Sequence, residues 1–156
     1  MEWMTLAGPR FGALVGVGST VVADRTRWRR DAGERARQER REIYWACLVT
    51  FRQAHEAMRA MATGDQEREA AGLDAAVREA FRASGCNEAR ESAVICVPTE
   101  MVSAIDAAYY SLRRLRDVLA SGSSLRSSAC QEAREAHQQA VRDARAAMRI
   151  DLDRRA

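Results

Sequence analysis

Lysine is absent from this chain of 156 residues, and all 25 basic residues are arginine. Glycine and proline are scarce, at nine and two residues, and aromatic residues make up only 6%. So few loop-forming residues leave material for only a few breaks between long helices. The strand-favouring residues are also few and lie mostly near the start, which disfavours an all-β fold. Arginine and 30 alanines favour helix, so the sequence predicts an all-α protein.

Paired cysteine motifs are also missing. The four cysteines, Cys47, Cys86, Cys96 and Cys130, form no C-x-x-C pair. This scatter disfavours a secreted disulfide framework. We expect Cys47 and Cys130 to be small buried hydrophobic residues in a reducing compartment.

Long apolar runs are absent except at the start. Residues 3–23 carry a single charge, Arg10, over 21 residues. As a helix they would extend about 31 Å, close to the ~30 Å hydrocarbon core of a bilayer. Arg10 lies near one end and can reach outward to the interface. The sequence therefore predicts a transmembrane anchor over residues 1–23; if Pro9 starts the helix, the 13 residues that follow Arg10 suit an interfacial or buried segment instead.

The charges that flank this run indicate its orientation. A basic cluster follows it, whereas only the α-amine and Glu2 precede it. Positive charge collects on the cytoplasmic side, and aromatic residues mark both interfaces. We therefore expect a single-pass protein of the bacterial inner membrane with its N-terminus outside and its C-terminus in the cytoplasm. The predicted membrane-interface residues are Trp3, Arg25, Arg27, Trp28, Arg29 and Arg30.

Small residues recur every four positions within the predicted span: Gly8, Gly12, Gly16 and Thr20. A tandem G-x-x-x-G pattern permits close approach of two helices in a membrane. It predicts a homodimer through this face. The alternative is that glycine is simply frequent in membrane helices.

Residues 24–42 form an arginine-rich juxtamembrane segment. Arg27, Asp31, Arg35 and Glu39 alternate in sign at four-residue steps, which predicts a solvated helix with internal ion pairs that also contacts anionic lipid. Nucleic-acid binding is the competing reading, because clustered arginines contact phosphate. The interleaved acids disfavour nucleic acid as the partner.

Residues 43–156 carry apolar stripes at three- and four-residue spacing, which predict a cytoplasmic bundle of three or four antiparallel helices. The helices are expected to break at residues 63–65, at residues 84–85 and near residues 121–122. Between the last two breaks, residues 98–100 supply the start of a helix. The last helix is expected to begin near Ser124. Its stripe is mostly alanine.

Motifs for chemistry are not visible. His55 and His137 are the only histidines, and neither has the spacing of a zinc or di-iron site. We interpret both as residues at the edges of apolar stripes; whether they meet Cys47 and Cys130 across the bundle is left open. No nucleophile or phosphate-binding motif occurs. The sequence predicts no catalytic residue, no metal site and no cofactor.

Several short segments resemble small single-span proteins of high-GC bacteria, described as KilB-like or CchlQ-like. They are the apolar start with Gly16-Val17-Gly18-Ser19-Thr20, then Ala23-Asp24-Arg25, Arg27-Trp28-Arg29-Arg30, Arg40-Arg41, His55-Glu56-Ala57-Met58-Arg59 and the closing residues 146–152. The resemblance implies a single span and supplies no catalytic residue. Arg10 departs from it, since an apolar residue is usual there.

These features predict a membrane-anchored helical interaction or scaffold protein, not an enzyme, whose partners are the bilayer, a second copy and a cytoplasmic protein. The alternative is a peripheral helical regulator that binds nucleic acid or anionic lipid through residues 25–41. A third hypothesis, an enzyme or ligand sensor with a pocket inside the bundle, has no convergent polar motif in its favour.

Overall fold

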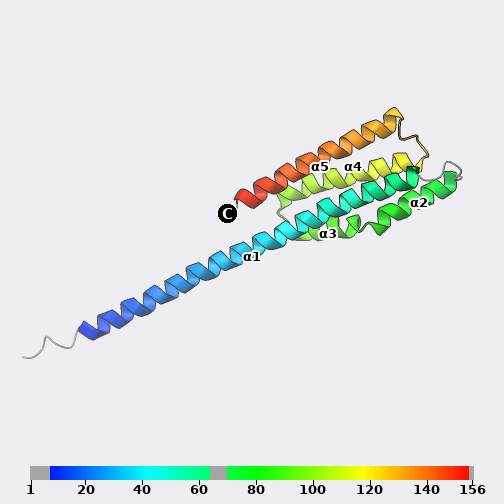
Figure 1. The fold of residues 1–156 in the computed structure, drawn as a ribbon. Coiled ribbons are helices and arrows are strands. Elements are labelled where there is room, and N and C mark those ends of the chain that lie inside the picture. Colours follow the sequence, from blue (N-terminus) through cyan, green and yellow to red (C-terminus); the bar gives the residue numbers. More distant parts are fainter. Residues whose placement is uncertain (1–7, 64–69, 155–156) are drawn as a thin grey trace, which may run out of the picture. The chain divides into compact units, whose positions relative to one another are not determined.

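The computed structural model describes residues 8–63 and 70–154, with side chains described for residues 27–28, 30–63 and 72–154. These ranges are helical and contain no strand, so the all-α prediction is confirmed for them. The helices, labelled in Figure 1, are α1 (Gly8–Thr63), α2 (Ala70–Ala83), α3 (Cys86–Cys96), α4 (Thr99–Ala120) and α5 (Ser128–Arg154).

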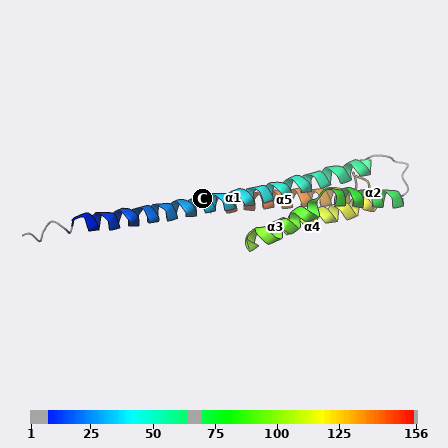
Figure 2. The ribbon, with the colours of Figure 1, turned by 90° about the horizontal axis from the view of Figure 1, so that it is seen from below.

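The chain divides into two compact units, residues 1–38 and residues 39–156. The second unit is a four-helix bundle (Figures 1 and 2). Its four legs, which alternate in direction, are the C-terminal part of α1, the consecutive helices α2 and α3 taken together, α4 and α5. Helix α4 contacts α2, α3 and α5. The sequence left three or four helices open, and the structure shows four legs.

Among the described residues, no helix combines the length and the apolar character needed to cross a membrane. The predicted anchor at residues 1–23 lies outside the described side chains, and only the backbone of α1 from Gly8 onward is described there. The anchor therefore stays a prediction.

The core of the bundle is built from the apolar residues that recur at three- and four-residue spacing in the sequence. Phe51 and Met58 of α1, Ile105 and Leu112 of α4, and Val77 of α2 are at most 1% exposed. Helix α5 contributes the small residues Ala133 and Ala144, with Met148 near its end. Cys47 and Cys130 are buried and free of disulfides, as expected.

The helix boundaries follow local backbone chemistry. Gly85 and Gly122 have φ angles of 73° and 75°, in the left-handed region where a side chain is strained, and they end α2 and α4. The expected start of the last helix at Ser124 is wrong by four residues. The Oγ of Ser127 accepts a hydrogen bond from the backbone N–H of Cys130 at 3.3 Å, so Ser127 caps α5.

Candidate functional site

The two histidines meet where α1 packs against α5. The ring centroids of His55 and His137 lie 5.6 Å apart, with the planes at 76° in an edge-to-face arrangement. His55 is half-buried, and its position at the edge of a stripe agrees with the sequence interpretation. His137 is only 3% exposed, so its assignment to a stripe edge is wrong. It lies in the core.

A polar contact ties the ring of His137 to α4. The Nδ1 atom of His137 lies 3.1 Å from the hydroxyl oxygen of Ser111. That hydroxyl also lies 2.7 Å from the carbonyl oxygen of Ala108, to which it can donate its single hydrogen. When it does so, the hydrogen between Ser111 and His137 belongs to Nδ1. Ser111 thus gives the buried imidazole a polar partner within the bundle.

Both histidines resist protonation. The pKa of His137 is lowered to about 4, mainly by burial and also by repulsion from His55, while a hydrogen bond to the backbone of Ala108 acts to raise it. Burial also lowers the pKa of His55, as does the positive charge of Arg59. The charge of Glu56 raises the pKa of His55. At neutral pH the buried ring of His137 is therefore uncharged.

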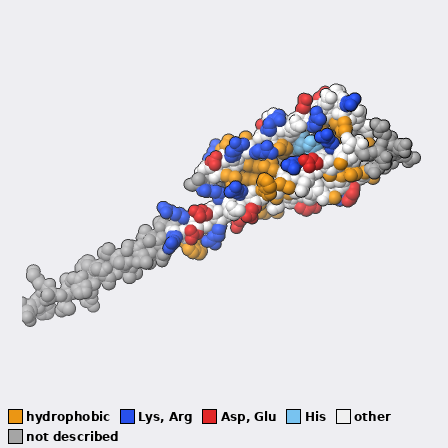
Figure 3. All heavy atoms as spheres, viewed as in Figure 1, with side chains coloured by type: hydrophobic (Ala, Val, Ile, Leu, Met, Phe, Trp, Pro, Cys, Tyr) orange, Lys and Arg blue, Asp and Glu red, His pale blue; other side chains and the backbone are white. Residues whose placement is uncertain are grey.

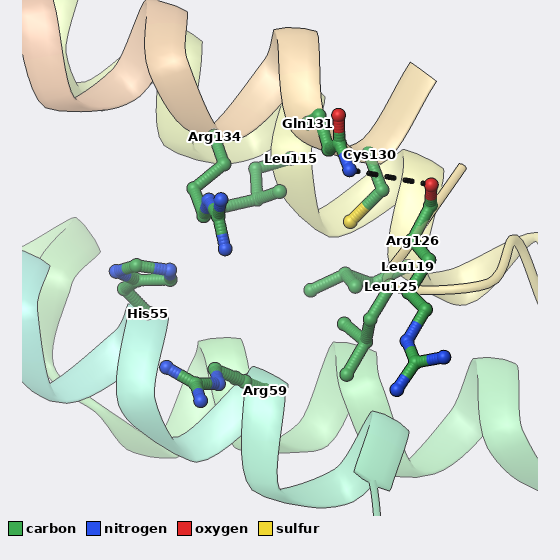
Figure 4. A pocket seen from close by; sticks show the side chains of 9 residues that line it. All are labelled: His55, Arg59, Leu115, Leu119, Leu125, Arg126, Cys130, Gln131 and Arg134. Atoms are coloured by element: carbon green, nitrogen blue, oxygen red, sulfur yellow. Dashed lines mark hydrogen bonds between the residues drawn. The ribbon is translucent and has the colours of Figure 1, made fainter. Parts of the chain in front are cut away.

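A cavity of about 240 Å³ opens beside His55, at the end of the bundle where α4 turns into α5 (Figure 4). Its walls come from α1, α4, the α4–α5 connection and the first turns of α5. The lining residues are His55, Arg59, Leu115, Leu119, Leu125, Arg126, Cys130, Gln131 and Arg134. Figure 4 shows His55, Arg59 and Arg134 on one side of this cavity and Leu119 and Leu125 on the other.

The permanently charged side chains that line this cavity are all arginines: Arg59, Arg126 and Arg134. No ion pair joins Arg59, Arg126 or Arg134 to a carboxylate among the residues with described side chains. The first turn of α5, which carries Cys130 and Gln131, adds the positive end of the helix dipole. In Figure 3, blue arginine surface borders the pale-blue histidine surface, with acidic surface on one side. The cavity is therefore suited to negative charge.

The arrangement does not make a metal centre. In the part of the chain that the structure describes, no three His, Cys, Asp or Glu side chains converge to hold a metal ion. Cys130 and His55 do line the same cavity. Cys47 faces α3 instead, where its thiol donates to the carbonyl of Ala89 at 3.3 Å, and burial raises its pKa to about 11. That thiol stays protonated and unreactive at neutral pH.

A second polar cluster joins α1 to the end of α5. Tyr44 donates its hydroxyl to Oδ2 of Asp151 at 2.8 Å, and Nε of Arg40 lies 3.3 Å from the same oxygen. Asp151 is 8% exposed and Tyr44 3%. A carboxylate this buried requires such partners, so the cluster serves to hold the two helices together.

The predicted membrane-interface residues are only partly described. Trp28 is 74% exposed on α1, and Arg27 and Arg30 are exposed beside it. The side chains of Trp3, Arg25 and Arg29, and those of the predicted dimer face Gly8, Gly12, Gly16 and Thr20, lie outside the described residues.

The expected ion pairs along the arginine-rich segment are not formed. Over the described side chains, Arg27 makes no ion pair with Asp31, nor Arg35 with Glu39. Nε of Arg35 instead donates to the backbone carbonyl of Asp31 at 3.2 Å. Exposed guanidinium groups gain little from an ion pair in water, so such pairs are readily absent. The described side chains of this segment are largely exposed, as expected for a solvated helix, but the predicted pairs of Arg27 with Asp31 and of Arg35 with Glu39 are wrong.

Sequence reasoning missed the arginines of the cavity. Arg59, Arg126 and Arg134 come from three separate segments, so no spacing pattern could have joined them.

Comparison with family models, with curated proteins and with solved structures finds no match for this chain.

Proposed function

We propose that this chain is a membrane-anchored helical interaction protein, in which residues 1–23 insert into the bilayer and the bundle binds a partner in the cytoplasm. The observation that carries the proposal is Trp28, which is 74% exposed between the exposed residues Arg27 and Arg30. An exposed aromatic ring among arginines, just after an apolar stretch, is typical of a membrane interface. The well-packed core of the bundle leaves its outer faces available for a partner.

Membrane insertion is tested by washing isolated membranes with alkaline carbonate. We expect the full chain to stay in the pellet, and its complete release would contradict the proposal. The variant Val15→Arg adds a second charge within the span at a cost of about 2.5–3.5 kcal/mol, so it should be released. Val15→Leu keeps the apolar character and should behave as the wild type.

The orientation can be tested with the native cysteines. Cys96 is exposed, whereas Cys47, Cys86 and Cys130 are buried. If the bundle is cytoplasmic, the inner membrane shields Cys96 from a maleimide that cannot cross membranes. In cells with a permeable outer envelope, the reagent should therefore label the chain only after the cells are disrupted. Cys96→Ser, the matched control, should lose the labelling. Labelling of Cys96 in intact cells would reverse the orientation.

One observation favours the alternative of a peripheral regulator. Arg27, Arg30 and Arg35 are exposed, and none is neutralised by an ion pair with a described carboxylate, so this segment presents positive charge to anionic lipid or nucleic acid. Binding of the full chain to duplex DNA that weakens steeply with salt, together with release by carbonate, would favour this alternative. Retention in carbonate-washed membranes would exclude it.

A further inference from the structure

We propose that the cavity beside His55 is a binding site for a small organic carboxylate with a short apolar body. This inference does not depend on the membrane anchor, since every residue that forms the cavity belongs to the bundle.

Positive charge defines one part of the ligand. Arg59 reaches the cavity from α1, Arg134 from α5, and Arg126 from the connection before α5. All three side chains are exposed and none is neutralised by a described carboxylate, so an anion in the cavity would be attracted by three positive charges. The planar guanidinium group matches a carboxylate with two parallel hydrogen bonds.

The apolar wall defines the other part. Leu115 and Leu119 line the cavity from α4, and Leu125 lines it from the connection. Leu115 and Leu119 are packed within the protein, at most 2% exposed, so the partly buried Leu125 is the leucine most open to a ligand. In Figure 4, Leu119 and Leu125 lie opposite Arg59 and Arg134, so a ligand can place a hydrocarbon chain on these leucines and its carboxylate between these two arginines. An inorganic anion would make only the second of these contacts.

The volume limits the size of the ligand. About 240 Å³ corresponds to roughly eight times the ~30 Å³ that a water molecule occupies in the liquid. A ligand of about eight non-hydrogen atoms, such as hexanoate, fits that space. A nucleotide or a lipid with long chains exceeds this volume and would extend beyond the cavity into solvent.

The two histidines give a site-specific readout. The full chain, labelled with ¹³C, is titrated with sodium hexanoate while the Cε1–H resonances of His55 and His137 are followed by NMR. We expect a saturable shift of the His55 resonance with a dissociation constant on the order of 1 mM. Hexylammonium carries the same body with the opposite charge and should cause no saturable shift. Inorganic phosphate should bind at least tenfold more weakly, because it has no apolar body.

Two double variants distinguish binding in the cavity from a general effect of surface charge. Arg59→Gln with Arg134→Gln should weaken hexanoate binding at least tenfold. The matched control is Arg41→Gln with Arg145→Gln, which removes the same charge from exposed positions of the same two helices outside the cavity and should leave binding unchanged.

Leu125→Glu provides a second variant, because Leu125 lies between helices and is only partly buried. It places a carboxylate beside the arginines and should abolish binding while the helical circular dichroism is retained. Equal affinity for phosphate, a saturable shift with hexylammonium, or unchanged hexanoate binding in the Arg59/Arg134 variant would each overturn the proposal.

Discussion

His137 should make the stability of the bundle depend on pH between about 6.5 and 4, a window that begins above the range in which carboxylates titrate. The native ring has a pKa of about 4 because it is buried, whereas in the unfolded chain it titrates near its ordinary value of 6.5. As the pH falls below that value, the unfolded state binds a proton that the native state does not. The free energy of unfolding therefore decreases as the pH falls towards 4.

The size of the effect follows from the two pKa values. Each pH unit below 6.5 removes about 1.4 kcal/mol, so about 2 kcal/mol is lost at pH 5 and about 3 kcal/mol at pH 4. His137→Gln removes the titrating group and retains an amide that can donate to Ser111. We expect the variant to lose about 2 kcal/mol less than the wild type between pH 7 and pH 5.

The assay is urea unfolding of the full chain in a mild detergent, followed by circular dichroism at 222 nm at several pH values. Comparison with the variant removes the contributions of the carboxylates, since both proteins contain them. The same pH dependence in wild type and His137→Gln would refute the assignment of a buried, neutral His137.

Three further outcomes are expected. Tyr44→Phe removes the hydroxyl that donates to Asp151 and should lower the free energy of unfolding by about 1.5–3 kcal/mol in urea titrations, because the acceptor is a buried carboxylate; no change would show that this bond does not support the fold. Phe51→Ala empties a position that is 1% exposed and should cost about 3–5 kcal/mol in the same titrations, so a loss below 1 kcal/mol would contradict the packing described. Gly12→Ile with Gly16→Ile should abolish self-association in a membrane dimerisation assay, and unchanged association would remove the glycine face from the proposed dimer.

The breaks between helices were predictable because each has a local cause. Each of these breaks follows from the backbone preference of one residue: Gly85, Pro98 or Gly122. Such a preference can be inferred from the sequence without knowing which residues lie nearby in the fold. The start of α5 was less clear, because Ser123, Ser124 and Ser127 can all cap a helix. Only the completed structure selects among them.

Other features were hidden because they depend on partners distant in the sequence. The segment that became α3 buries only Cys86 and Ala93, so it shows almost no stripe. The core position of His137 depends on Ser111, 26 residues away. The cavity depends on residues from four segments: α1, α4, the α4–α5 connection and α5. Helical periodicity reports which face of a helix is apolar, but not which polar groups on different helices will meet.

The polar contacts between α1 and α5 help to explain why these helices pack in one register. Of the buried apolar residues of α5, Cys130, Ala133 and Ala144 are small and Met148 is large. Small side chains constrain the position of one helix along another less than large ones do, so the apolar packing depends mainly on Met148. Sliding α5 along α1 by one turn, ~5.4 Å, would displace Met148 and would also separate Asp151 from Tyr44 and Arg40. A buried carboxylate that loses a hydrogen-bond partner costs about 1–3 kcal/mol, so the polar contacts add to the apolar packing in selecting the register.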